Sequence, residues 1–417
     1  MNDHSLLQSL NEAQQKVVSA PQMHLLVLAG AGSGKTRVLV HRIAWLVNVE
    51  NISPHNILAV TFTNKAAGEM RHRLECLLDI PMKMMWVGTF HGLAHRLLRQ
   101  HWEAAGLIQT FQILDSDDQH RIIKRILTSL NLDEAQWAAK KVQWFINQQK
   151  DEGIRPHQIA NTQDPYTKTL IRIYQAYEDI CVRNGVIDFA ELILRSYDLF
   201  IKNPEILQHY QERFRHILVD EFQDTNTIQY AWLKLLGGGK SCLMIVGDDD
   251  QSIYKFRGAS VSNILKLKQD YKNLKDITLV DNYRSNQEIL DLAYNFIQTN
   301  NPNRLETQLE INKRLKGHNT DKSHIQVIEG KDLSEELNLV LTKAIELKDQ
   351  FPDATWNDFA ILTRANSGAA EIIPLLEAKL IPYSFVANRG LYRKPLIADL
   401  INYLRLLDNY HESSALY

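Results

Sequence analysis

The sequence predicts an α/β protein in which an all-helical segment interrupts the first α/β domain and a second α/β unit follows. Three observations lead to this prediction. Short apolar runs with the length and β-branching typical of buried strands alternate with helical segments at both ends of the chain. The stretch from about 93 to 185 contains only helical patterns. A glycine-rich turn separates the first apolar run from the helix that follows it.

Composition sets broad limits on what the protein is. A chain of 417 residues is long enough for about two to four domains. Apolar residues make up 45% and the net charge is −2, so any binding of a polyanion must come from a local patch. The three cysteines are far apart, which favours a reduced, cytoplasmic compartment. The polar N-terminus has no signal-peptide core, and no apolar run is long enough to span a membrane.

The turn after the first strand is the strongest single motif. The strand Leu25–Leu28 leads into Ala29-Gly30-Ala31-Gly32-Ser33-Gly34-Lys35-Thr36, and a helix is expected over 38–46. In such a loop the backbone N–H groups surround phosphates, the lysine adds a charge and the threonine hydroxyl ligates Mg²⁺. Ala29 stands where the first glycine of this pattern is usual. We therefore predict a nucleoside triphosphate site with Mg²⁺.

The remaining elements follow in order. Further strands are expected over 57–62, 87–90, 217–220, 243–247 and 277–280, with a helix over 64–78. Within the helical insertion, Ser116 to Gln119 is typical of a capping box. The polar stretch from Asn300 to Thr320 is interpreted as an exposed connection. A second α/β unit then has strands over 325–329, 359–363 and 382–386 and a helix over 395–407. The alternation predicts parallel sheets.

Two later strands end in residues suited to triphosphate chemistry. Asp220 and Glu221 end an apolar strand, where the first carboxylate can hold Mg²⁺ and the second can deprotonate water. Gln251 follows the next strand and is uncharged, so it can contact a γ-phosphate. The three aspartates just before it would repel a triphosphate unless they point away or lie near Mg²⁺. Arg284, at the junction of the two α/β units, can reach the γ-phosphate from the second unit, and Tyr283 can stack on adenine or lie in the core.

Three strand-end segments combine aromatic with basic, amide or hydroxyl side chains. They are Thr61–Ala67, Gly88–His91 and Tyr254–Gly258. Aromatic rings stack on bases while polar groups hold phosphates, which is typical of single-stranded nucleic acid binding without sequence readout. Each segment alone fits a core residue beside a surface turn better than a binding site, and the three together shift the balance toward binding.

Together these motifs resemble the UvrD/Rep/PcrA-type superfamily 1A DNA helicases. The resemblance rests on segments that occur in the order of that family along nearly the whole chain: Leu10–Gln14, Ala29–Thr36, Thr61–Ala67, Gly88–His91, Asp188–Leu192, Asp220–Asp224, Val246–Gly258 and Asn282–Ser285. It implies a RecA-like domain at 1–92 and 188–282, a helical insertion at 93–187 and part of a second RecA-like domain at 283–417. The implied activity is ATP-driven 3′→5′ translocation on single-stranded DNA and at junctions with duplex, with repair proteins as partners.

The resemblance also implies residue roles. Lys35, Glu221, Gln251 and Arg284 would be catalytic, and Thr36 and Asp220 would hold Mg²⁺. The implied ATP pocket consists of Gln14, which contacts adenine, and of Ala29, Gly30, Ala31, Gly32, Ser33, Gly34, Lys35, Thr36, Arg37, Tyr283 and Arg284. The implied DNA track consists of Phe62, Thr63, Asn64, Lys65, Thr89, His91, Tyr254, Phe256 and Arg257, with Phe256 where the family usually has tryptophan.

The match ends within the second domain, just after 403–407, so the chain resembles an N-terminal portion of such a helicase. The later motifs that carry a second arginine are not found. One alternative is therefore a non-catalytic, nucleotide-dependent module that binds single-stranded DNA. Another is a GTPase or small-molecule kinase. Guanine recognition lacks support, because Asn64-Lys65 is followed by alanines and not by an aspartate two places after the lysine.

Overall fold

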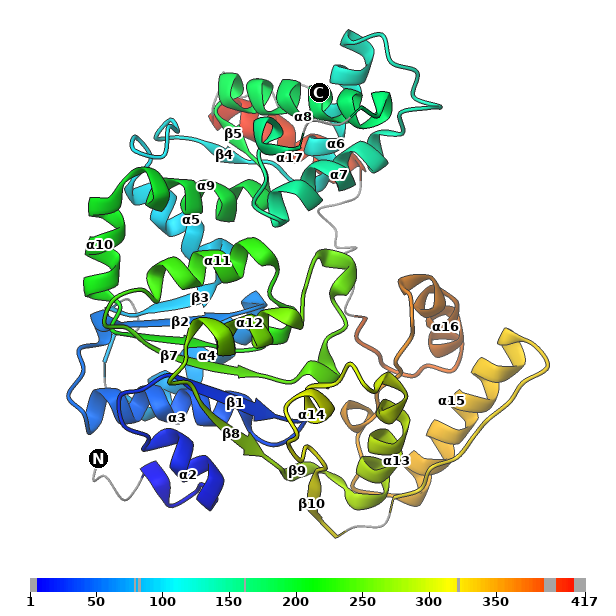
Figure 1. Ribbon diagram of the computed structural model, residues 1–417. Helices are drawn as coiled ribbons and strands as arrows, with labels where there is room; N and C mark the ends of the chain where they lie inside the picture. Colours follow the sequence, from blue (N-terminus) through cyan, green and yellow to red (C-terminus); the bar gives the residue numbers. More distant parts are fainter. Residues whose placement is uncertain are drawn as a thin grey trace. The chain divides into compact units, whose positions relative to one another are not determined.

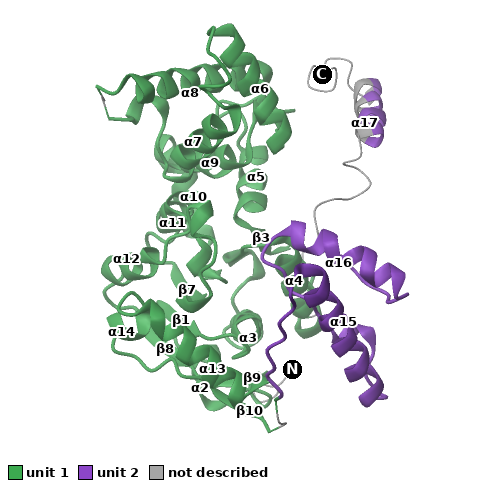
Figure 2. Ribbon diagram, turned by 90° about the vertical axis from the view of Figure 1, so that its right-hand side faces the viewer, with its two compact units in different colours: residues 1–323 green, residues 324–417 purple. Residues whose placement is uncertain are grey.

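The computed structural model describes residues 6–78, 80–81, 84–160, 163–320, 323–385 and 395–408. The chain divides into two compact units, Met1–Ser323 and His324–Tyr417 (Figure 2). Each unit is described by itself below. None of the described helices combines the length and apolarity needed to cross a membrane.

A six-stranded sheet forms the centre of the first unit, with its strands in the order β3-β2-β6-β7-β1-β8 (Figure 1). The strands are β1 Leu25–Ala29, β2 Ile57–Thr61, β3 Trp86–Thr89, β6 His216–Val219, β7 Cys242–Gly247 and β8 Lys275–Leu279. Every pairing is parallel, with Val27 opposite Val246 on one side and Ile277 on the other. The carboxyl ends of the strands therefore meet at one edge, where open α/β sheets bind ligands.

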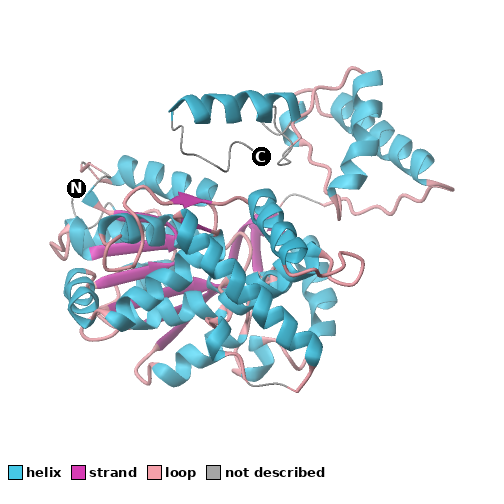
Figure 3. Ribbon diagram, turned by 90° about the horizontal axis from the view of Figure 1, so that it is seen from above, coloured by secondary structure: helices cyan, strands magenta, loops and turns pink. Residues whose placement is uncertain are grey.

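Helices cover both faces of this sheet, as the cyan helices around the magenta strands in Figure 3 show. Leu26 and Leu28 of β1 pack into one core while Leu25 and Val27 pack into the other, so the strand reads as a continuous apolar run. One core includes α2 Glu12–Val18, α3 Lys35–Asn48 and α4 Asn64–Leu77. The other includes α5 Phe90–Gln100, α9 Phe189–Lys202, α10 Pro204–Arg213, α11 Thr227–Leu236 and α12 Ser262–Asp270. The predicted parallel α/β fold is confirmed.

The helical insertion has a core of its own. It contains α6 Ser116–Ser129, α7 Ala139–Asp151 and α8 Pro165–Asn184, and its buried residues run from Leu114 to Val186. A two-residue strand pair, β4 Gln112–Ile113 with β5 Val186–Ile187, joins the points where the chain enters and leaves. The predicted capping box at Ser116 is wrong. Asp115 is extended and caps α6, because its carboxylate accepts hydrogen bonds from the N–H groups of Asp117 and Asp118 at 2.8 Å each.

A buried ion cluster fastens the insertion to α9. The Lys150 ammonium on α7 contacts Glu178 at 2.9 Å, Asp188 at 2.8 Å and Glu191 at 2.9 Å. Asp188 also caps α9 through the N–H of Glu191. Because Lys150 is fully buried, its three carboxylate partners hold its pKa well above the ordinary value although burial alone would lower it. This cluster fixes Asp151 and Phe189, which both reappear in the groove described below.

After β8 the chain continues within the first unit through β9 Asp281–Asn286, α13 Gln287–Ile297, α14 Leu305–Gln308 and β10 Lys316–Asn319. Strands β9 and β10 pair in parallel. The interpretation of 300–320 as an exposed connection holds for most of its residues, but Leu305 is fully buried and Arg304 and Lys313 are only 3% and 7% exposed. Residues 283–323 group with the first unit by their contacts, and the second domain from 283 stays a prediction.

The second unit contains α15 Leu333–Gln350, α16 Asn366–Ala378 and α17 Pro395–Asp408, the last as predicted. A small core joins Leu341, Ile372, Leu376 and Ile381. The strands predicted over 325–329 and 359–363 are not formed, nor is the described part, 382–385, of the third; residue 386 lies outside the described residues. These segments are apolar but find no ladder partner among the described residues, and Leu362 is 93% exposed. Short 3₁₀ turns complete the fold: η1 Pro54–Asn56, η3 Pro156–Gln158, η4 Phe222–Asp224, η5 Asp249–Gln251, η6 Lys255–Arg257, η7 Gln298–Asn300 and η8 Trp356–Asp358.

Candidate functional site

The turn between β1 and α3 has the conformation of a phosphate-binding loop. Gly32 and Gly34 have φ values of +70° and +90°, which side chains with a Cβ rarely adopt. The Ser33 hydroxyl donates to the Gly30 carbonyl at 2.7 Å and closes the turn. A Cβ at Gly30 would lie 2.7 Å from the side chain of Leu315. The predicted loop therefore forms at the carboxyl end of β1 and opens onto the N-terminus of α3, where anions bind.

Lys35 opens α3 with a buried ammonium that lacks a hydrogen-bond partner among the described residues. Its nearest carboxylate oxygen is Oε2 of Glu221, at 3.7 Å. A buried cation in a native protein is normally satisfied by hydrogen bonds, so this ammonium, with only a loose ion pair, can still donate hydrogen bonds to an anion in the loop. The phosphates of a nucleoside triphosphate fit this loop and this charge.

Asp220 at the end of β6 lies opposite the loop. The Thr36 hydroxyl donates to Asp220 Oδ2 at 3.2 Å, and the Glu221 N–H donates to Oδ1 at 3.0 Å. Burial and then the neighbouring Glu221 carboxylate raise the pKa of Asp220 to about 6, while Lys35 opposes the shift. A nearby cation would stabilise the ionised form of this buried carboxylate. The carboxylate and the Thr36 hydroxyl are oxygen ligands of the kind that Mg²⁺ prefers.

Glu221 adopts a left-handed backbone conformation, with φ of +50°. Such a conformation is sparsely populated for a residue with a Cβ, and it occurs preferentially at functional sites. The Gln223 amide donates to its carboxylate at 2.7 Å. The strained turn thus directs a partly exposed carboxylate toward Lys35, where it can accept a proton from water.

Gln251 and the aspartates before it occupy the next turn along the sheet edge. The Gln251 amide donates to Asp248 Oδ2 at 2.7 Å. Asp248, Asp249 and Asp250 each contact the Lys313 ammonium, at 2.7, 2.5 and 2.8 Å. One ammonium within the protein therefore offsets part of their negative charge. The sequence analysis considered only that these aspartates point away from a triphosphate or lie near Mg²⁺, and it did not identify the lysine that they contact.

The segment Asn282–Arg284 lies directly against the phosphate loop. Asn282 donates to the Ala31 carbonyl at 2.5 Å and the Tyr283 N–H donates to the Gly32 carbonyl at 3.0 Å. A Cβ at Gly32 would lie 2.7 Å from the Cβ of Arg284. The structure thus brings Arg284 to the loop, with its side chain exposed.

The predicted adenine-side residues gather around α2. Gln14 is buried and completes a capping box with Asn11, and its amide also donates to the Ser33 carbonyl at 3.0 Å. The Tyr283 hydroxyl accepts from Asn11 at 2.7 Å, and its ring stacks on His318 with centroids 4.7 Å apart. Arg37 is exposed and donates to the Ser9 carbonyl at 2.8 Å. These residues flank the loop, and their contact with a base stays a prediction.

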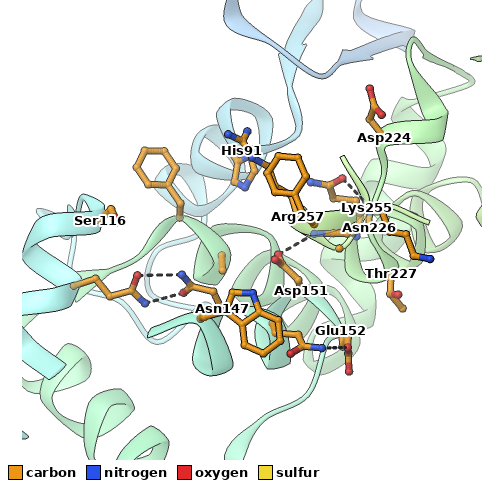
Figure 4. A pocket seen from close by; sticks show the side chains of 18 of the residues that line it. His91, Ser116, Asn147, Asp151, Glu152, Asp224, Asn226, Thr227, Lys255 and Arg257 are labelled. Carbon is orange, nitrogen blue, oxygen red and sulfur yellow. Dashed lines mark hydrogen bonds between the residues drawn. The ribbon is translucent and has the colours of Figure 1, made fainter. Parts of the chain in front are cut away.

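A separate cavity of about 610 Å³ lies between the sheet edge and the helical insertion (Figure 4). Among the predicted DNA-track residues, Phe62, His91, Phe256 and Arg257 line it. Tyr254 stands behind this lining, with its ring centroid 5.0 Å from that of Phe62 and 6.0 Å from that of Phe256. The structure therefore brings three of the predicted segments to one groove.

The other predicted track residues do not line the cavity. Thr63 and Thr89 are helix caps, since their hydroxyls accept from the N–H groups of Ala66 at 3.1 Å and Gly92 at 3.2 Å. Asn64 and Lys65 are exposed in the first turn of α4. For the two threonines the cap hydrogen bond is a sufficient structural reason for the residue type.

Two aromatic residues in the groove were missed from the sequence. Trp144 on α7 is 61% exposed and Phe189 on α9 is 55% exposed, and both line the cavity. A signal for Trp144 existed, because it lies two positions from both Val142 and Ile146, which face the insertion core. At about 100° per residue, two positions place Trp144 on the opposite face of the helix.

The groove combines basic with acidic groups. Lys255 and Arg257 line it together with Asp151 and Glu152, and Asp151 lies beside the turn that carries the two cations (Figure 4). Burial and then the charge of Asp188 raise the pKa of Asp151 to about 7, opposed by a hydrogen bond from Asn226 at 2.8 Å. Burial lowers the pKa of His91, so its ring is neutral at pH 7.

One short segment connects the two sites. Asp220 and Glu221 face the phosphate loop, while Asp224, Asn226 and Thr227 line the groove. Burial and then the Glu221 carboxylate raise the pKa of Asp224 to about 6. A change at the nucleotide pocket can therefore reach the groove through only a few residues of η4.

Known proteins match the whole chain. The UvrD/REP helicase N-terminal domain family matches residues 10–272, and the UvrD-like helicase C-terminal domain family matches residues 277–417. DNA helicase II of Escherichia coli is 48% identical over 98% of this chain and 56% of its own length. DNA helicase II of Haemophilus influenzae is 47% identical over 100% of this chain and 56% of its own length. ATP-dependent DNA helicase PcrA of Leuconostoc citreum is 38% identical over 100% of this chain and 55% of its own length. The chain spans about half the length of these relatives.

Proposed function

The chain belongs to the UvrD/REP helicase family, and we propose that it uses ATP and Mg²⁺ to move along single-stranded DNA. The observation that carries this proposal is the orphaned Lys35 ammonium, 3.7 Å from Glu221 in a phosphate loop. The 3′→5′ direction, action at single-strand/duplex junctions, a role in DNA repair and repair-protein partners come from the family alone. They are proposals for a chain that spans about half of its relatives.

We assign each residue of the pocket one task. The loop amides and Lys35 bind the phosphates and hold the β–γ bond in place. Thr36 and Asp220 would hold Mg²⁺, which neutralises charge on the phosphate oxygens when bound. Glu221 orients the attacking water and accepts its proton. Gln251 and Arg284 contact the γ-phosphate.

The groove supplies the DNA site. Phe62, Phe256, Phe189 and Trp144 offer ring faces on which bases stack, and Arg257 offers charge to the phosphate backbone. Every base has a π-face, so this site binds without sequence preference. The short path from Glu221 to Asn226 provides the physical route by which DNA changes the ATP pocket.

A second candidate is a module that binds nucleotide and DNA but hydrolyses little. One observation favours it: the described residues of the second unit form helices without a sheet, so they present no second RecA-like face. Catalysis in a cleft that must close would then be weak.

The rate of ATP hydrolysis with and without an oligothymidylate separates the candidates. We expect the ATPase rate of a motor to rise at least about tenfold, which corresponds to about 1.4 kcal/mol less activation free energy. A flat, near-zero rate with intact ATP binding would favour the module. Preference for GTP without any response to DNA would contradict both.

Asp151 predicts a pH dependence of DNA binding. Its pKa of about 7 leaves the carboxyl neutral below that pH and charged above it, and the charge would face a polyanion. We expect DNA affinity to fall about threefold to tenfold as the pH rises through 7, as one charge worth about 1 kcal/mol would give. The raised pKa also affects the free energy of unfolding, because the folded state binds the Asp151 proton more tightly than the unfolded state. This contribution to stability is complete below the unfolded-state pKa of 3.8 and is lost as the pH rises through about 7.

Fluorescence anisotropy of a labelled oligothymidylate between about pH 6 and 8 measures this effect. The Asp151→Asn variant keeps the shape and cannot ionise, so its affinity should fall less than that of the parent as the pH rises through 7. Asp224, which also lines the groove and has a pKa of about 6, is unchanged in both proteins and contributes the same slope to each. His91 also lines the groove, and burial lowers its pKa below the ordinary value, so its titration lies below that of Asp151 and is common to parent and variant. An equal pH slope in parent and variant would contradict the assignment.

A further inference from the structure

Three consecutive carboxylates enclose one ammonium beside the nucleotide pocket. Lys313 Nζ contacts Asp248, Asp249 and Asp250 at 2.7, 2.5 and 2.8 Å, and the lysine side chain is only 4% exposed. The three carboxylates lie close enough together to bind a metal ion, and the ammonium already contacts all of them. Moving the three aspartates away from Lys313 would leave a buried charge without a partner, which is energetically costly. The ammonium therefore holds the turn 248–250 in place.

Arg304 extends this cluster. Its guanidinium forms two hydrogen bonds to the carboxylate of Asp250, both at 2.7 Å, and a third to Glu306 at 2.6 Å. The N–H of Leu305 donates to Asp249 at 2.8 Å. Glu306 in turn accepts from the Lys313 N–H at 2.9 Å. The segment 304–313 is therefore folded onto the turn 248–250 by charge and by backbone hydrogen bonds.

The cluster leads directly to the predicted γ-phosphate contact. Asp248 shares its carboxylate, with Oδ1 on Lys313 and Oδ2 on the Gln251 amide. The Asp248 N–H donates to Gln223 at 3.0 Å, and Gln223 holds Glu221. The position of Lys313 thus determines how Asp248 presents Gln251, and it also influences the residue that orients Glu221.

The same segment reaches the other side of the pocket. Leu315, two residues after Lys313, lies against Gly30 of the phosphate loop. Lys316 donates its N–H to the Val280 carbonyl at 2.8 Å and begins β10, which pairs with β9. Strand β9 carries Arg284. Residues 313–316 therefore touch the Gln251 turn, the phosphate loop and the strand of Arg284 in succession.

We infer that Lys313 is a positioning residue of the ATP site, which holds Gln251 in place and links it to the strand that carries Arg284. This inference rests on the proposed function. The two residues that would recognise the γ-phosphate come from distant parts of the sequence, and the segment 304–316 is what connects them. Loss of Lys313 should therefore affect discrimination between ATP and ADP more than nucleotide binding as such.

The test compares the binding of ADP and of a non-hydrolysable ATP analogue, each with Mg²⁺, to the parent and to Lys313→Met. We expect ADP affinity to change less than about twofold and the preference for the ATP analogue to fall about tenfold, the size of one hydrogen bond to a charged group. Arg314→Met is the matched control. That neighbouring cation is 58% exposed, pairs with Asp291 at 2.9 Å and should leave the preference unchanged.

A double-mutant cycle with Gln251→Ala distinguishes positioning from general damage. If Lys313 acts through Gln251, the double variant loses no more discrimination than Gln251→Ala alone. The inference would be overturned if the losses of discrimination in the two single variants multiplied in the double variant. It would also be overturned if Lys313→Met lost affinity for ADP and for the ATP analogue equally. If Lys313→Met does not fold, Lys313→Gln, which keeps a donor, is expected to show the same selective loss. A parent that binds neither nucleotide would overturn the proposed function and this inference together, whereas a discriminating parent with an unchanged variant would overturn only the inference.

Discussion

Replacing Lys35 with alanine abolishes ATP hydrolysis, with an expected fall in turnover of about 100- to 1,000-fold or more. The ammonium is buried at the start of α3 with no hydrogen-bond partner among the described residues, and its nearest acidic oxygen is 3.7 Å away on Glu221. Apart from this loose ion pair, the hydrogen-bonding capacity of the ammonium is unused and is available to the phosphates. A steady-state ATPase assay with single-stranded DNA present measures the loss.

The same substitution should not destabilise the fold. Removing an incompletely satisfied buried cation relieves a desolvation cost, and Glu221 keeps its hydrogen bond from Gln223 at 2.7 Å. We expect the melting temperature of Lys35→Ala to equal or exceed that of the parent. Lys16→Ala is the matched control, because Lys16 is exposed and pairs with Glu12 on the surface of α2. Equal turnover in Lys35→Ala and the parent would remove the pocket assignment.

The features that the sequence predicted correctly are local in the chain. The phosphate loop is one contiguous run, and its glycines are needed for backbone conformations that Gly32 and Gly34 do adopt. The strands of the first sheet are buried on both faces, so their apolar runs are continuous and easily recognised. The acidic pair at Asp220 and Glu221 ends such a run, and its place at the sheet edge follows from the parallel topology.

The features that the sequence did not predict depend on distant partners. The stretch 300–320 is polar, which normally indicates exposure, but Arg304 and Lys313 are buried because their counter-charges lie some sixty residues earlier. No periodicity reports such a pairing. The second-unit strands failed for the converse reason: Val327 and Leu362 are apolar, yet apolar sequence forms a strand only when a neighbouring strand completes the ladder.

The groove shows an intermediate case. Phe62, His91 and Phe256 were identified because aromatic and polar residues follow strand ends, and the sheet brings these ends together. Trp144 was missed because it belongs to the helical insertion. Local sequence patterns can place Trp144 on a helix face, but they do not predict that the insertion lies beside the sheet. Thr63 and Thr89 were predicted to contact DNA because they are polar residues at strand ends. In the structure their hydroxyls cap the helices that follow.

Glu221→Gln is expected to bind ATP normally and to hydrolyse it about 100- to 10,000-fold more slowly, the usual contribution of a general base. The amide keeps the shape of the side chain but cannot accept the proton of the attacking water. The substitution also removes the negative charge that helps to raise the pKa of Asp220 to about 6. Asp220 then ionises more readily, so Mg²⁺ and nucleotide should bind at least as tightly as in the parent.

This combination separates a base from a metal ligand. Asp220→Asn should weaken Mg²⁺-dependent nucleotide binding itself, whereas Glu221→Gln should retain binding and stop at the chemical step, as single-turnover measurements would show. Asp224 is the competing base, because burial and the Glu221 charge raise its pKa to about 6 and its Oδ1 lacks a hydrogen-bond partner among the described residues. If Asp224→Asn were inactive while Glu221→Gln turned over like the parent, the proton would go to Asp224. We expect the reverse, because Glu221 is the carboxylate within 4 Å of Lys35 and the one held there by a strained backbone.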